Sequence, residues 1–249
     1  MPSIFIAHGA PPLLDDERWV RELGDWANAM PRPRAILMLS AHWEERPATL
    51  GATTTVPLIY DFYGFPQHYY EQQYAAPGAP DLAQRIRSSI ANVADEPARG
   101  LDHGAYVPLV AMYPHADIPV LQMSLPSDNP QDLFNLGRSL RPLRDEGVLI
   151  AGSGFITHNL RAIDCSGGPP QAWAKEFDAW TADAIAKKDA DSLLDFMKKG
   201  PGAGIALPTR EHFVPLLVAL GAADDNATVQ FPIDGFWMGS FTRRSVQFG

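Results

Sequence analysis

Apolar, strand-like runs alternate with helical patterns along this chain, and a histidine follows three of the runs at or soon after their ends. The three pairs are Ser3–Ala7 with His8, Ala35–Ala41 with His42, and Gly147–Gly154 with His158. A further histidine, His212, opens the apolar run Phe213–Val218. The carboxyl ends of parallel strands share one edge of an open α/β sheet, which is where such folds bind ligands. The alternation therefore constrains both the fold and the place where these histidines would meet.

Patterns between and after these runs complete the predicted architecture. Helical spacing of apolar residues, cap residues and breakers predicts a helix between Asp16 and Pro31, with its apolar residues from Trp19 to Ala27, and further helices over about 82–90, 130–144, 170–188, 192–199 and 211–221. Further strands are expected over 49–56 and 118–125, and two β-rich runs lie in the tail 228–248. This order predicts a three-layer α/β/α fold, and the β-rich tail indicates that its central sheet is mixed. No linker-like or repeated segment interrupts the chain, so residues 1–249 are expected to form a single domain.

The composition excludes several classes of function. A formal net charge of −9 without a clustered basic face argues against nucleic-acid binding. The single cysteine, Cys165, excludes an internal disulfide and fits a reducing compartment. No basic leader and no apolar run of membrane-spanning length is present, which predicts a cytoplasmic protein without a membrane partner.

Three of the histidines are candidates for a metal centre with its site at the strand carboxyl ends. Neutral imidazoles of His8, His42 and His212 could hold a divalent ion and leave positions open for substrate and for water or dioxygen. Two histidines and one carboxylate are the commoner ligand set of non-haem iron, so Glu211 competes with His212 as third ligand. Adjacent residues at a helix start diverge by roughly 100°, so one of the two is expected to face the metal, and we favour His212.

The remaining histidines differ in their surroundings. His158 follows the glycine-flanked end of a strand-like run, where an imidazole could act as an acid or base. His103 lies beside Asp102 in what is expected to be a loop. His68 and His115 lack such a context and are expected to have no role in a site.

Several aromatic residues near these histidines could form the walls of a pocket. Trp43, Tyr63 and Phe65 are the candidates for contact with an aromatic substrate, together with Tyr106. Buried aromatic residues serve cores at least as often. The segment from Ile59 to Pro66, however, contains more aromatic residues than a surface connection needs.

The ordered combination of these motifs resembles a known family across nearly the whole chain. The motifs are Ala7–Gly9, Ser40–Trp43, Ile59–Pro66, Asp102–Gly104, Thr157–Leu160, Glu211–Leu216 and Gly235–Phe241. Together they are similar to the class III extradiol ring-cleaving dioxygenases, also called the LigB superfamily, in the branch that includes DOPA dioxygenases. Each motif alone is weakly specific, whereas their order is specific.

The resemblance implies a non-haem Fe(II) enzyme that opens the ring of a catechol, a DOPA-like or related aromatic diol, with O2 to give a muconic semialdehyde. Zinc is also found in the site of members of this branch. By resemblance, His8, His42 and His212 bind the metal, His158 is the acid/base catalyst and His103 is a second active-site histidine. Elsewhere in the superfamily the third ligand is a glutamate, which keeps Glu211 in competition with His212.

Two other functions remain compatible with three clustered histidines. A zinc-dependent hydrolase would use the same ligand set to activate water. A binding protein on the same scaffold would recognise a ligand without turnover, although such relatives are expected to lose metal ligands. The sequence selects neither one catechol nor one oligomeric state.

Overall fold

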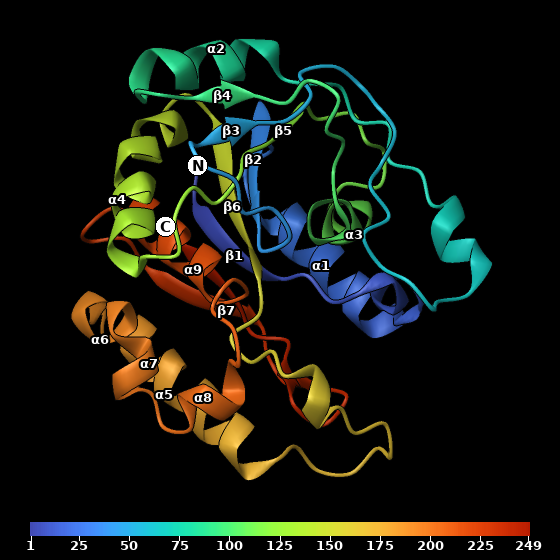
Figure 1. The fold of residues 1–249 in the computed structure, drawn as a ribbon, viewed down its shortest axis with the longest axis vertical. Coiled ribbons are helices and arrows are strands. Elements are labelled where there is room, and N and C mark those ends of the chain that lie inside the picture. Colours follow the sequence, from blue (N-terminus) through green and yellow to red (C-terminus); the bar gives the residue numbers. More distant parts are fainter.

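Six strands form the central sheet of the computed structural model, which describes residues 1–249, in the order β5-β2-β6-β1-β10-β7 (Figure 1). The strands are β1 (Ser3–Ala7), β2 (Ala35–Ser40), β5 (Val120–Gln122), β6 (Val148–Gly154), β7 (Val229–Ile233) and β10 (Ser245–Phe248). The first four run parallel, and β10 lies antiparallel to both β1 and β7. The predicted mixed sheet is therefore confirmed. Its antiparallel part comes from the β-rich tail.

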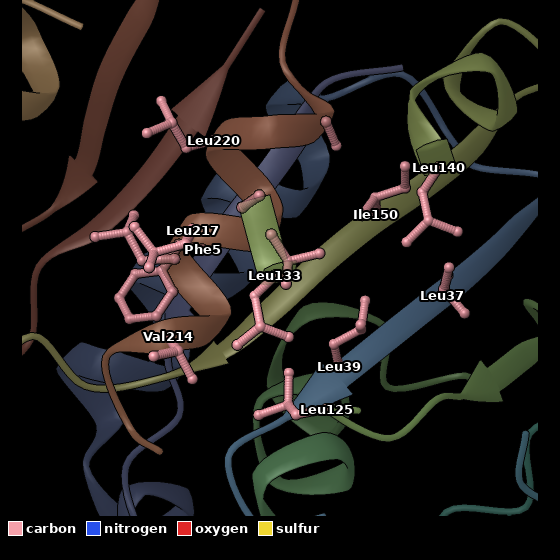
Figure 2. Packing of buried hydrophobic residues seen from close by; sticks show 14 of the residues in the cluster. Phe5, Leu37, Leu39, Leu125, Leu133, Leu140, Ile150, Val214, Leu217 and Leu220 are labelled. Atoms are coloured by element: carbon pink, nitrogen blue, oxygen red, sulfur yellow. The ribbon is translucent and has the colours of Figure 1, made fainter. Parts of the chain in front are cut away.

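Helices cover both faces of this sheet because neighbouring residues of each buried strand point to opposite sides. On one face, Phe5 and Ile150 belong to a cluster that includes the helices α4 and α9; Figure 2 shows this packing. On the other face, Ile4 and Leu149 pack with α1 and α3. The three-layer α/β/α architecture is thus confirmed, and the core lies on both sides of the sheet.

The helices begin largely where cap residues predict. Asp16 accepts a hydrogen bond from the backbone N–H of Trp19 at the start of α1, and Asn129 accepts one from Gln131 at the start of α4. The α-helices are α1 (Glu17–Ala29), α2 (Pro80–Ser89), α3 (His103–Met112), α4 (Pro130–Leu140), α5 (Ala172–Ala186), α6 (Ala190–Leu194), α7 (Phe196–Lys199), α8 (Ala203–Ala206) and α9 (Val214–Ala222). Short 3-10 helices span Pro11–Asp15, Gln67–Glu71, Arg141–Arg144 and Leu160–Ala162. Two small sheets pair β3 (Thr49–Leu50) with β4 (Ala94–Asp95) and β8 (Phe236–Trp237) with β9 (Phe241–Thr242).

Helix α3 is the main element that the sequence pattern does not predict. His103 was expected in a loop but is the first residue of this helix, which Asp102 caps through the N–H of Ala105. The expectation was wrong because α3 is buried on nearly all sides and so lacks an amphipathic period. Pro108, inside the helix, is a further signal against helix in a sequence.

Other boundaries differ in smaller ways. The strand expected over 49–56 is limited to Thr49–Leu50, and the helix expected over 192–199 is divided at Asp195 into α6 and α7. The helix expected from Glu211 begins at Val214, so that His212 lies in the turn before it. No helix is both long and apolar enough to cross a lipid bilayer.

Two glycines of β6 allow the segment before α9 to lie directly on the sheet. A Cβ atom on Gly152 would overlap the carbonyl oxygen of Pro215, and one on Gly154 would overlap that of His212. A 2.8 Å hydrogen bond from the N–H of Phe155 to the His212 carbonyl joins this segment to the end of β6. This close approach, which only glycine permits, places His212 at the carboxyl end of β6.

Candidate metal centre

The carboxyl ends of the three central strands β2, β6 and β1 bring three histidines to one edge of the sheet. His8 directly follows β1 and donates its backbone N–H to the carbonyl of Gly154, at the end of the neighbouring strand β6. His42 is the second residue after β2. His158 lies four residues beyond β6, and its N–H bonds the carbonyl of Ala206. The edge predicted from the sequence is therefore the one at which these imidazoles meet.

The ring nitrogens of His8, His42 and His212 form the candidate ligand set that consists of three imidazoles. One nitrogen from each ring lies within 4.8 Å of those from the other two. The Nε2 atoms of His8 and His42 are 3.2 Å apart, and the Nε2 atom of His212 is buried without a hydrogen-bond partner. A buried nitrogen without a partner is costly unless something occupies its lone pair, so this donor set fits a divalent metal ion.

Each of these three imidazoles has an oxygen atom next to its other nitrogen, Nδ1. The Nδ1 atom lies 2.8 Å from Ser153 Oγ in His8, 2.9 Å from Glu211 Oε1 in His212 and 3.6 Å from Asp61 Oδ2 in His42. Oxygen acceptors behind ligand histidines fix which nitrogen stays bare for a metal. Glu211, which the sequence leaves open as an alternative third ligand to His212, therefore contacts the Nδ1 side of that ring.

Asp61 is a site residue that the sequence analysis missed. Its Oδ1 atom accepts hydrogen bonds from the backbone N–H of His103 at 3.0 Å and from the Nδ1 of the same residue at 2.8 Å. The ring centroid of His103 lies 4.0 Å from that of His42. Asp61 is 42 residues away from His103, and its only signal was its place in the aromatic segment Ile59–Pro66.

His158 joins the cluster by stacking on His212. The two ring centroids are 3.5 Å apart, and the ring planes are inclined by 6°. Glu211 brings its carboxylate within 4.8 Å of ring nitrogens of both histidines. All five histidines singled out in the sequence therefore lie together, whereas His68 and His115 lie exposed outside the cluster.

The predicted aromatic walls lie in different surroundings. Trp43 is buried, and the guanidinium carbon of Arg99 lies 4.3 Å from the centroid of its ring. Tyr106 is buried as well. By contrast, 92% of Tyr63 is exposed.

Phe62 is the aromatic side chain that the loop places against an imidazole. Its ring meets that of His103 edge-on, with the centroids 5.8 Å apart. Phe65 is half-buried and packs edge-on against Phe62 at 5.6 Å. The hydrogen bonds from His103 to Asp61, the residue before Phe62, hold this aromatic segment at the site.

Burial keeps most of the imidazoles neutral. It lowers the pKa of His42 to about 3, and the charge of His103 adds to this, against the opposing effect of Asp61. Burial likewise lowers the pKa of His158 to about 4. The pKa values of His8 and His212 also fall well below 6.5, through burial and through repulsion by the neighbouring histidines. Neutral imidazole is the form that binds metals, so burial prepares the cluster for an ion.

We expect the metal-free protein to lose stability as the pH falls from about 7 to about 5. A histidine with a lowered pKa binds fewer protons in the folded protein than in the unfolded chain, so acid favours unfolding. Each such histidine contributes a slope of up to about 1.4 kcal/mol per pH unit below about pH 6.5. Urea titrations should show the decrease, and His42→Asn should make it shallower. A free energy of unfolding that stays constant over this range would contradict the lowered pKa values.

Comparisons with known proteins agree with this geometry. The family model described as the catalytic LigB subunit of aromatic ring-opening dioxygenase matches residues 6–247. The 4,5-DOPA dioxygenase extradiol of Escherichia coli K12 is 39% identical, over 100% of this chain and 95% of the relative. The protein of the same name from Beta vulgaris is 41% identical, over 95% and 92% respectively.

A solved structure carries the same fold. The crystal structure of a protein described as uncharacterized, from Escherichia coli K12, superposes with a TM-score of 0.87 at 36% identity, covering 100% of both chains. Enzymes of the matched family depend on a metal, and the histidine cluster offers a place for one. The chain belongs to the LigB family and is an extradiol aromatic ring-opening dioxygenase, an oxidoreductase that acts on an aromatic substrate and O2.

Proposed function

We propose that this protein uses Fe(II), held by His8, His42 and His212, to open the ring of a DOPA-like catechol next to its diol. The product would be a muconic semialdehyde that contains both atoms of O2. The observation that carries the proposal is the set of three mutually close ring nitrogens, one of them buried without a partner. The names of the relatives support DOPA or a related diol as substrate.

The metal would be bound through the bare nitrogens of the three imidazoles. When bound, it supplies Lewis-acid and redox activation of a diol and of dioxygen. Zinc would fit the same three nitrogens without the redox chemistry. The chain's own residues would bind and orient the substrate and move its protons.

His158 is proposed as the acid/base group. Its pKa of about 4 leaves the imidazole neutral near pH 7, so it can accept a proton from a catechol hydroxyl and later return one. Stacking on His212 holds the ring beside a proposed ligand. A base in this position would act beside a diol bound at the proposed metal.

His103 is proposed as the second active-site histidine. Its Nδ1 donates to Asp61, which leaves the Nε2 lone pair free to accept a hydrogen bond from a substrate hydroxyl. Phe62 and Phe65 would contact the substrate ring from the same loop, with Tyr63 at the exposed end of the segment and Trp43 packed behind the site. Residues 1–249 would act as one catalytic domain, since strands from both ends of this range share the sheet.

An oxygen-electrode screen tests the proposal. Protein loaded with Fe(II) should consume one O2 for each diol and form a yellow product with DOPA or another catechol, while zinc-loaded protein should not. A panel of DOPA, caffeate, protocatechuate and catechol would rank the substrates. Absence of oxygen uptake with every diol would refute the proposed function. Oxygen-independent hydrolysis by the zinc form would favour the hydrolase, which the relatives do not support.

A further inference from the structure

We propose that Ser153 is a positioning residue that fixes the tautomer of His8, with the proton on Nδ1 and a bare Nε2. This inference rests on the proposed role of His8 as a metal ligand. Ser153 lies in β6 with no exposed surface, between its sheet partners Ile6 and Ser40. Its hydroxyl contacts both the His8 ring and the start of helix α3.

Proton counting at the hydroxyl gives the tautomer. Ser153 Oγ is 2.5 Å from the carbonyl oxygen of Gly104 and 2.8 Å from His8 Nδ1. A carbonyl oxygen only accepts, and two oxygens this close repel each other unless a proton lies between them. The single hydroxyl proton of Ser153 is therefore donated to Gly104. The serine oxygen is then the acceptor, so the proton of this contact must come from His8 Nδ1–H.

Pro108 explains why the Gly104 carbonyl is available to Ser153. In an α-helix, the carbonyl of residue 104 accepts from the N–H of residue 108, four positions later. Proline has no N–H, so the interior proline of α3 removes that donor. Ser153 supplies the donor that the helix cannot. Pro108, which argues against a helix in the sequence, thus leaves the Gly104 carbonyl without its helical donor, and this carbonyl bonds Ser153 instead.

The absence of a side chain at position 104 brings this carbonyl close enough. A Cβ atom on Gly104 would overlap Ser40 Oγ, and it would lie 2.9 Å from His42 Cδ2 and 3.2 Å from His8 Nδ1. Helix α3 therefore packs its first turn directly on the two imidazoles. The carbonyl, the hydroxyl and the His8 ring form a buried hydrogen-bonded chain.

A fixed tautomer matters for the nitrogen that faces the cluster. His8 Nε2 lies 3.2 Å from the Nε2 of His42, on the side where the proposed ion would be held. With the proton on Nδ1, its lone pair is free before any metal arrives. With the opposite tautomer, an N–H would occupy that direction, and binding would first require the proton to move.

The tautomer can be measured without metal, substrate or mutation. Long-range ¹H–¹⁵N NMR spectra of metal-free protein labelled with [¹⁵N]histidine distinguish Nδ1–H from Nε2–H rings, and a His8→Gln variant assigns the His8 signals. We expect His8 to be the Nδ1–H tautomer in the wild type. An Nε2–H tautomer in the wild type would overturn the inference, whatever any variant does.

Ser153→Ala tests the cause. We expect the His8 signals to shift to a mixture or to Nε2–H, and Zn²⁺ affinity, measured by chelator competition, to fall about 10- to 100-fold. Ser3→Ala is the matched control, because Ser3 is equally buried in the adjacent strand β1 and donates to the carbonyl of Ala219, away from the histidines. It should leave the tautomer and the Zn²⁺ affinity unchanged.

Failure of the inference is distinct from failure of the proposed function. If Ser153→Ala keeps both the Nδ1–H tautomer and the wild-type Zn²⁺ affinity, Ser153 does not position His8. If His8→Gln keeps wild-type Zn²⁺ affinity, His8 is not a ligand, and the proposed metal centre is wrong. The two results come from separate variants and separate measurements.

Discussion

His158→Ala is expected to lower kcat for catechol opening by about 10²- to 10⁴-fold, because it removes the proposed proton acceptor. Metal content should stay at the wild-type level, since His158 stacks on His212 but is not one of the three proposed ligands. The measurement is oxygen uptake by the Fe(II)-loaded protein at saturating diol, together with the iron-to-protein ratio. The loss should therefore appear in catalysis alone.

His158→Phe provides a control for the stacking contact. Phenylalanine keeps a planar ring that can lie against His212 but has no nitrogen to take up a proton. It should be as inactive as the alanine variant. His115→Ala, which changes an exposed histidine outside the cluster, should remain fully active. A His158→Ala enzyme that keeps more than about a tenth of wild-type kcat would remove this residue from acid/base catalysis.

His212→Ala is expected to abolish retention of one metal ion per chain. The buried Nε2 of His212 faces no partner in the protein, whereas its Nδ1 is held by Glu211. Removing the imidazole removes a proposed ligand, while removing the carboxylate leaves the ligand but frees its ring. Glu211→Gln should therefore bind metal only about 10- to 100-fold more weakly. Metal stoichiometry after dialysis, with thermal unfolding as a check of folding, distinguishes the two variants.

The same pair of variants decides between the two ligand sets left open by the sequence. If the third ligand were Glu211, then Glu211→Gln would lose the metal as completely as His8→Ala, and His212→Ala would retain it. That outcome would reverse the proposed roles of the two adjacent residues. The 2.9 Å contact between Glu211 Oε1 and His212 Nδ1 predicts instead that His212→Ala loses the metal and that Glu211→Gln retains it with weaker affinity.

The sequence predicts the sheet edge and its histidines well because that information is local. Buried parallel strands read as continuous apolar runs, so the positions of His8 and His42 just beyond β1 and β2 follow from counting along the chain. The family resemblance, which depends on the order of the motifs, adds the expected roles. Such features need no knowledge of which segments meet in space.

What the sequence does not reveal depends on tertiary packing. Asp61 becomes a site residue only because a loop 42 residues before His103 folds over it. Ser153 reads as one small residue in a strand, and its contacts with His8 and Gly104 require β1, β6 and α3 to be assembled. Helix α3 itself lacks periodicity because it is buried on nearly all sides. The exposure of Tyr63 likewise follows from the path of its loop.

Strand β1 lies between β6 and β10, so the strand that leads into His8 has sheet neighbours from distant parts of the chain. Ser3 is opposite Phe248, and the N–H of Ala7 bonds the hydroxyl of Ser245. During synthesis on a ribosome, the early-made strand must wait for residues 245–248 to emerge before its second edge is paired. Contacts of such long sequence separation form slowly. The proposed metal site, which includes His8, would therefore be completed only late in the folding of the chain.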